Sequence, residues 1–173
     1  SAINNRGQVV GWSFAEGGEH AVLWSLPDND VKDLGTLGAN HSYAEAINDR
    51  GQVAGYSSTA TPVTTHAFLW ERGEMTDLAD IRLPGDSYAH GINFWGAVVG
   101  GIQSESGSGR AFLWSKGCGM QDLNTLLEDG VLLSSAADIN DLGQIAAEGN
   151  AGGNTHGFLL RQWARVPMVE RLW

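Results

Sequence analysis

The length and composition of the chain exclude several classes of protein. Its 173 residues fit one domain with an ordinary hydrophobic core, or two very small ones, and 42% hydrophobic residues exclude a disordered chain. The net charge of −10 argues against nucleic acid as a partner, because an acidic surface repels phosphate. A single cysteine, Cys118, excludes an internal disulfide, and no apolar run is long enough for insertion into a membrane as a helix.

The first predicted element is a strand that ends in an Ile-Asn pair and continues into a tight turn. The pair recurs with spacings of 44, 45 and 47 residues, at Ile3-Asn4, Ile47-Asn48, Ile92-Asn93 and Ile139-Asn140. A Gly follows three residues after each Asn, as in the segment 48–51. Because Asn can bond its own backbone and Gly supplies positive φ, this segment predicts a hairpin turn.

Three further strands are predicted after each turn. The second strand is a short apolar run such as Gln52–Gly55, and it leads through a variable Ser- and Gly-rich loop to the third. The third strands are the matching segments His20–Trp24, His66–Trp70, Arg110–Trp114 and His156–Leu160. The fourth strands are Val31–Leu34, Met75–Leu78, Met120–Leu123 and, with a weaker match, Val169–Leu172.

Four strand-like elements that recur four times in register predict an all-β fold. Repeats of about 40–50 residues with four strands each are typical of β-propeller blades. We therefore predict one domain over residues 1–173, a β-propeller of four four-stranded blades at approximately 1–38, 39–83, 84–130 and 131–173. Small residues on the first two strands suit the crowded centre, and the repeated Trp24, Trp70 and Trp114 are predicted to lie in the core.

Several of these motifs resemble the HAF repeat family of probable extracellular bacterial repeat proteins. The resemblance covers residues 2–160 and is clearest at His66-Ala67-Phe68 and at residues 33–38, Asp-Leu-Gly-Thr-Leu-Gly. The chain departs from the pattern at Val22, Arg110, Gly157 and Leu160. The resemblance implies a secreted or cell-surface β-propeller and no established biochemical activity. Kelch blades are similar at the level of architecture only.

The candidate ligand site is the central mouth of the predicted propeller. Alternate residues of the innermost strand face the axis, and this register places Tyr43, Glu45, Tyr88, His90 and Asp138 there. Exposed aromatic rings near the first hairpin, which include Trp12 and Tyr56, could stack on sugar rings, so carbohydrate is a possible ligand. Packing or a protein interface is the favoured explanation of the same residues.

Catalytic and metal-binding motifs are each better explained by the repeat. His20, His66 and His156 share one repeat position and are expected to bond a neighbouring turn or blade backbone. Ser87 follows Gly-Asp as in one hydrolase motif, but Ser42 and Ser134 stand in the same register. Acidic loops at residues 28–30 and 138–143 lack a complete calcium ligand set, so we expect no metal and no cofactor.

The C-terminal segment is predicted to make intermolecular contacts. Its apolar residues Trp163, Val166, Met168, Leu172 and Trp173 follow the last predicted third strand, and exposed residues of this kind usually mark an interface. The ring either closes by packing of its four blades or is completed by further repeats or another copy. We therefore expect a secreted or surface module with a binding, structural or assembly function, with a protein partner or self-association. The alternatives are a lectin-like propeller and, less favoured, a hydrolase or lyase with acids at the mouth.

Overall fold

The fold is all-β, as the repeat predicts. The computed structural model describes residues 2–26, 29–61, 63–80, 82–104, 107, 109–127, 130–163 and 166–172, and for 162, 163 and 166–172 it describes the backbone alone. In these ranges the chain forms strands β1 to β16 and one 3-10 turn, η1 (Leu123–Leu126). Within the same ranges no helix has the length and apolarity needed to cross a membrane.

The strands follow the four sequence repeats, and we call these groups unit 1 to unit 4. Unit 1 contains β1 (Ala2–Ile3), β2 (Gln8–Ala15), β3 (Gly18–Ser25) and β4 (Asp30–Asp33). Unit 2 contains β5 (Gly38–Ile47), β6 (Val53–Thr59), β7 (Thr65–Glu71) and β8 (Glu74–Asp77). Unit 3 contains β9 (Asp86–Ile92), β10 (Val98–Gln103), β11 (Gly109–Ser115) and β12 (Gly119–Asp122). Unit 4 contains β13 (Val131–Ile139), β14 (Ile145–Ala151), β15 (Asn154–Trp163) and β16 (Val166–Leu172).

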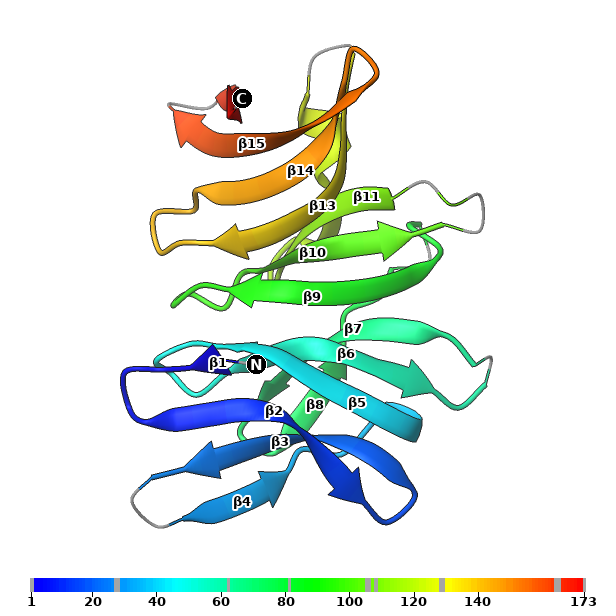
Figure 1. The fold of residues 1–173 in the computed structure, drawn as a ribbon, viewed down its shortest axis with the longest axis vertical. Helices are drawn as coiled ribbons and strands as arrows, with labels where there is room; N and C mark the ends of the chain where they lie inside the picture. Colours follow the sequence, from blue (N-terminus) through cyan, green and yellow to red (C-terminus); the bar gives the residue numbers. More distant parts are fainter. Residues whose placement is uncertain are drawn as a thin grey trace.

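Within each unit, consecutive strands pair antiparallel. Units 3 and 4 are separate four-stranded sheets, whereas units 1 and 2 belong to one eight-stranded sheet. A single parallel residue pair, Glu19 with His41, joins β3 to β5 in that larger sheet. Strands β13 to β15 lie at one end of the long axis and β2 to β4 at the other, so the row of sheets is open (Figure 1). Of the two arrangements left open by the sequence, closure of the four units on themselves is not observed in the described residues.

The predicted Asn turns join each unit to the next. In unit 2, the side-chain oxygen of Asn48 accepts hydrogen bonds from the backbone N–H of Arg50 and Gln52, each at 3.0 Å. The Asn48 side-chain amide donates to the Asn93 carbonyl of unit 3 at 2.9 Å. Asn4 and Asn93 make the equivalent bonds to the following unit, at 3.0 and 3.3 Å. Each Asn therefore closes its own hairpin and contacts its neighbour at the same time.

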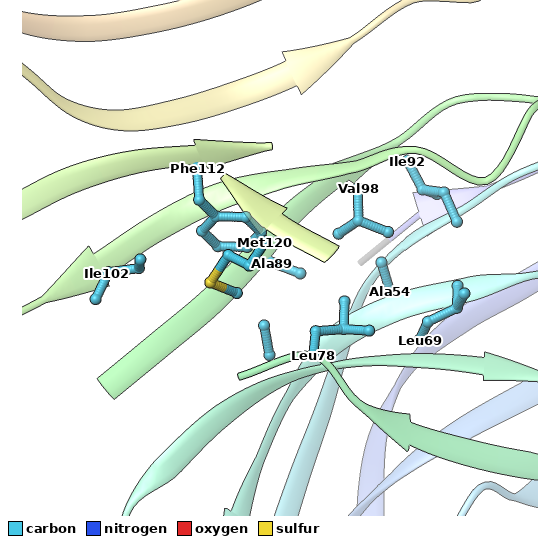
Figure 2. Packing of buried hydrophobic residues seen from close by; sticks show 10 residues of the cluster. Ala54, Leu69, Leu78, Ala89, Ile92, Val98, Ile102, Phe112 and Met120 are labelled. Carbon is cyan, nitrogen blue, oxygen red and sulfur yellow. The ribbon is translucent and has the colours of Figure 1, made fainter. Parts of the chain in front are cut away.

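The hydrophobic core lies between units rather than inside one sheet. The cluster between units 2 and 3 joins Leu69 and Leu78 to Ile92, Val98 and Phe112, as Figure 2 shows. Equivalent clusters form between units 1 and 2 and between units 3 and 4. Burial of apolar side chains between sheets therefore holds the units together, because a single four-stranded sheet has no core of its own.

The predicted burial of the repeated Trp residues is correct for one position and wrong for another. Trp70 is 5% exposed and packs in the cluster between units 1 and 2. Trp114 is partly buried and packs against the cluster between units 2 and 3. Trp24 is 40% exposed, because in the described part of the chain no unit precedes unit 1 to cover it.

The C-terminal segment continues unit 4. Strand β16 pairs antiparallel with β15, so Trp163, Val166, Met168 and Leu172 lie on strand backbone, as the spacing of the fourth element indicates. Their side chains and the whole of Trp173 fall outside the described residues. The expected intermolecular contact of this segment stays a prediction.

Candidate functional site

Five aromatic rings form a continuous row across units 1, 2 and 3. The rings of Phe14, Trp12, Tyr43, Tyr56 and Tyr88 contact one another in this order, with successive centroids 5.9, 5.9, 5.1 and 5.0 Å apart. Three of the four contacts are edge-to-face, the arrangement that the ring quadrupole favours. Phe14 and Trp12 are 80% and 49% exposed, and the three tyrosines are partly buried. We call these five residues the aromatic row.

The repeat explains why these rings meet. Trp12 and Tyr56 both follow the Gly that ends the apolar run of the second strand, and Tyr43 and Tyr88 both follow the buried Ser of the first strand. Tyr43 lies directly opposite Tyr56 in the ladder between β5 and β6. Side chains opposite one another in antiparallel strands lie on the same face, so the first two strands of each unit contribute to one row.

The aromatic row ends where the repeat substitutes small and polar residues. Tyr88 lies opposite Gly101 in unit 3, and Ser135 lies opposite Glu148 in unit 4. The hydroxyl of Ser135 would lie 3.0 Å from a Cβ placed at Gly101, so it occupies the space that a ring would need. One end of the row therefore carries exposed apolar rings and the other end carries a carboxylate.

Acidic groups border the aromatic row. The Tyr43 hydroxyl donates a short hydrogen bond to Glu19, and this bond, aided by burial and the Glu19 charge, raises the pKa of Tyr43 to about 12. Nδ1 of His41 lies 3.8 Å from the same carboxylate. Burial raises the pKa of Tyr56, and the nearby Glu45 adds to this effect. Both tyrosines therefore keep a neutral hydroxyl over the physiological pH range.

His90 lies within electrostatic reach of two carboxylates. Its side chain reaches solvent, yet surrounding protein withdraws water from the charged imidazolium and lowers the pKa of His90. Glu45 and Glu148 oppose this shift through their negative charge. The hydrogen bonds of the described residues include none between His90 and either carboxylate.

A repeated β-bulge sets the orientation of two predicted mouth residues, and its position shows that a third was assigned the wrong register. The ladder between the first two strands skips Glu45 in unit 2, His90 in unit 3 and Ala137 in unit 4. A bulge re-aims the side chain of the extra residue, so Glu45 and His90 share one orientation in the repeat. Asp138 stands one position later in the repeat, at the position that Gly91 occupies in unit 3. The Asp138 carboxylate would lie 2.8 Å from a Cβ placed at Gly91. The structure therefore places Tyr43, Glu45, Tyr88 and His90 on the first strands of neighbouring units, whereas the common register assigned to Asp138 is wrong. That these residues line a central mouth stays a prediction.

The repeated histidines bond a carboxylate rather than a turn backbone. Nδ1 of His20 lies 2.8 Å from Asp33, and Nδ1 of His66 lies 2.8 Å from Asp77. The other oxygen of Asp33 accepts the N–H of Gly35, and Asp77 accepts that of Ala79. Desolvation acts to raise the pKa of Asp33, but the bonds from Gly35 and His20 outweigh it, so this pKa is lowered. The His-Asp pair thus ties the third strand of a unit to the fourth and to the turn after it.

The Ser position of the repeat is structural in two units. The hydroxyl of Ser42 accepts the N–H of Ala21 in unit 1 and donates to the Gly35 carbonyl. The Ser87 hydroxyl accepts the N–H of Ala67 in unit 2. Both side chains are buried, and they bond the preceding unit, as the common register indicates.

One cleft lies on a different part of the surface. It has a volume of about 320 Å³ and lies between units 2 and 3, where Arg50, Glu71, Trp95, Trp114 and Lys116 contribute to its walls. None of the residues of the aromatic row lines it. Among the described residues no group of three or more His, Cys, Asp or Glu side chains is placed to hold a metal ion.

Comparison with known proteins supports the fold class. No family model matches the sequence, and no curated protein matches it. The structure is similar to the crystal structure of TolB from Acinetobacter baumannii, with a TM-score of 0.64 and 14% sequence identity. The match covers 98% of this chain and 42% of the TolB chain. An all-β fold of β-propeller type is therefore the class that the structure defines.

Proposed function

We propose that this chain is a non-catalytic binding module of a β-propeller and that it recognises a neutral oligosaccharide along the aromatic row. The observation that carries the proposal is the contact of five rings from three units, two of which are well exposed. A row of this kind presents several stacking surfaces in line, as an extended chain of sugar rings requires.

The chemistry of the aromatic row favours a neutral polyhydroxylated ligand. The apolar faces of sugar rings pack on Trp and Phe, and the carboxylates of Glu45 and Glu148 can accept hydrogen bonds from hydroxyl groups. An anionic ligand would meet these carboxylates and a net charge of −10. A nucleic acid is disfavoured for the same reason.

Three observations support a binding role over catalysis. His90 forms no hydrogen bond with Glu45 or Glu148 among the described residues, so neither carboxylate orients it as a catalytic His is oriented by a neighbouring acid. The two His-Asp pairs lie on the third and fourth strands, and both oxygens of Asp33 are engaged in structural bonds. Ser87 is buried and accepts a backbone bond.

The finer architecture belongs to the same proposal. We propose that units 1 to 4 are four four-stranded blades of a propeller and that each blade packs on the next through the same repeat positions. The resemblance to the HAF repeat family supports a secreted or cell-surface location. An experimental structure of the chain tests the blade architecture. Fractionation of the source cells tests the location.

The binding proposal is tested with a panel of neutral oligosaccharides, followed by calorimetric titration of the ligands that bind. We expect Trp12→Ala to weaken binding about tenfold, which corresponds to about 1.4 kcal/mol. Phe94→Ala is the matched control, because Phe94 is 40% exposed and lies on a hairpin turn outside both the row and the cleft. Binding of no neutral oligosaccharide, or equal losses in the two variants, overturns the proposal. If the chain binds a basic peptide and no oligosaccharide, the proposed ligand class is wrong.

A further inference from the structure

Each contact between units joins two defined faces. We call the face that a unit turns to the next unit its leading face, and the opposite one its trailing face. Between units 1 and 2, the leading face of unit 1 contributes Val10 and Leu23, and the trailing face of unit 2 contributes Ile47, Val53 and Trp70. The clusters between units 2 and 3 and between units 3 and 4 use the equivalent positions.

The trailing face of unit 1 is uncovered at these positions. Ile3 is 66% exposed, whereas its equivalents Ile47, Ile92 and Ile139 are 9%, 8% and 6% exposed. Trp24 is 40% exposed and Trp70 is 5% exposed. Val31 is 58% exposed, whereas its equivalent in unit 3, Met120, is 4% exposed. These residues are apolar because the repeat places them in an interface, so their exposure marks a face suited to pack on another unit.

The leading face of unit 4 is uncovered in a complementary way. Ala146 is exposed, while its equivalents Val10, Ala54 and Val99 are 1%, 0% and 0% exposed. The amide of Asn140 donates to Gln144 at 2.7 Å and, unlike the amides of the three preceding turns, to no Asn carbonyl of a following unit. Asn140 is exposed as well, whereas those other Asn residues are 8%, 6% and 5% exposed.

We propose that the leading face of unit 4 docks on the trailing face of unit 1 of a second copy of this chain, head to tail. The three internal contacts show which surface covers each of these faces, and the two uncovered faces of one chain are the two halves of that contact. In the docked pair, the Asn140 amide donates to the carbonyl of Asn4 in the second copy, which among the described residues accepts the turn N–H of Gly7 at 3.2 Å. A contact between two different faces builds a ring or an open filament rather than a symmetric pair.

The charge of the chain gives this association a definite salt dependence. Two copies each carry a net charge of −10, and the docking faces named above are apolar or neutral. Salt screens the repulsion between the copies and does not weaken apolar contacts. Assembly should therefore strengthen as the salt concentration rises.

The test uses sedimentation velocity of the full chain across a micromolar concentration range, with two blocking variants. Trp24→Glu blocks the trailing face of unit 1, and Ala146→Glu blocks the leading face of unit 4. Both positions are exposed, so far-ultraviolet circular dichroism should match the parent. Val63→Glu is the matched control, because Val63 is 80% exposed in a loop outside both faces.

The expected result is concentration-dependent assembly of the parent and of the Val63 variant, with at least tenfold weaker association of each blocked variant alone. A mixture of the two blocked variants should form a dimer, because each supplies the face that the other lacks. A monomeric parent at all concentrations overturns the proposal. Association of the Ala146 variant alone at the strength of the parent overturns it too, since the contact would then not use the leading face of unit 4.

Discussion

Trp24 and Trp70 occupy the same repeat position in two environments, so one substitution made at both sites isolates the energy of packing between units. The ring of Trp70 is 5% exposed, and the Lys32 ammonium lies 4.8 Å from its centroid across the contact with unit 1. The ring of Trp24 is 40% exposed, and its Nε1 donates to Asn29 at 3.2 Å. We expect Trp70→Ala to lower the free energy of unfolding by about 3–5 kcal/mol, the range for emptying a large core site.

The structure also sets the expected difference between the two variants. The exposed fractions of the two rings differ by about a third, which is about 80 Å² of a large aromatic side chain and about 2 kcal/mol of burial. The cavity left at Trp70 and the lost cation–π contact add to this difference. Trp24→Ala should therefore cost at least about 2 kcal/mol less than Trp70→Ala.

Differential scanning calorimetry at a concentration where light scattering shows a monomer measures both costs. A difference of about 2 kcal/mol corresponds to a melting temperature about 4–8 °C lower for the Trp70 variant. Equal losses in the two variants would refute the assignment of Trp70 to an interface between units. An unchanged melting temperature for Trp70→Ala would show that the ring is not buried.

Three further predictions follow from the turns, the row and the loops. Asn48→Ala should destabilise by about 1–3 kcal/mol, because it leaves the buried N–H of Gln52 without an acceptor, whereas Asn140→Ala at the exposed equivalent should cost less. Urea denaturation of the pair measures the difference. The bond to Glu19 raises the pKa of Tyr43 from 10.0 to about 12, so its stabilising effect is complete below pH 10 and is lost as the pH rises toward 12. An ultraviolet absorbance titration should show a lower Tyr43 pKa in Glu19→Gln, and an unshifted curve would contradict the hydrogen bond. Millimolar calcium should leave the melting temperature unchanged, and a rise of many degrees would reveal a site that the acidic loops do not suggest.

The strands and turns could be predicted because the sequence signal for each of them recurs four times. Asn-x-x-Gly specifies a turn by local backbone chemistry, and Gly51 adopts a φ of 77° there. Side chains alternate between the two faces of each strand, so the pattern assigns one face to each contact between units. The buried residues, such as Phe68 and Phe112, therefore follow from the local pattern alone.

Features that depend on neighbours could not be predicted in the same way. The bulge at Glu45 and His90 adds one residue to a strand, and the residue pattern does not show it. Counting back from each Ile-Asn pair aligns Glu45 and His90 with Ala137, so the sequence itself excludes the common register assigned to Asp138. The bond from His66 to Asp77 joins residues eleven positions apart, and the sequence contains the signal for it, because both residues recur together in units 1 and 2. The repeat pattern predicts a buried Trp24 because it gives the same residue to every unit, whether or not another unit packs on that face.

The bulge and the aromatic row also depend on the close backbone approach at Gly100. A Cβ at Gly100 would lie 1.9 Å from the Tyr88 carbonyl oxygen and 2.8 Å from the Phe112 ring, so Gly100→Ala must displace strand β9. Gly55 makes the same approach to Tyr43, at 2.0 Å, whereas in unit 4 the equivalent residue is Ala147 and its strand has a second register shift. We expect Gly100→Ala to cost about 1–3 kcal/mol, the range for overpacking, and to separate Tyr88 from Tyr56. Near-ultraviolet circular dichroism should report the lost ring contact and calorimetry the lost stability. Ala147→Gly is the control, because it removes a buried methyl without creating a close contact and should leave the aromatic spectrum unchanged. A Gly100→Ala variant with parental stability and an unchanged aromatic spectrum would show that the backbone approach does not hold the row in place.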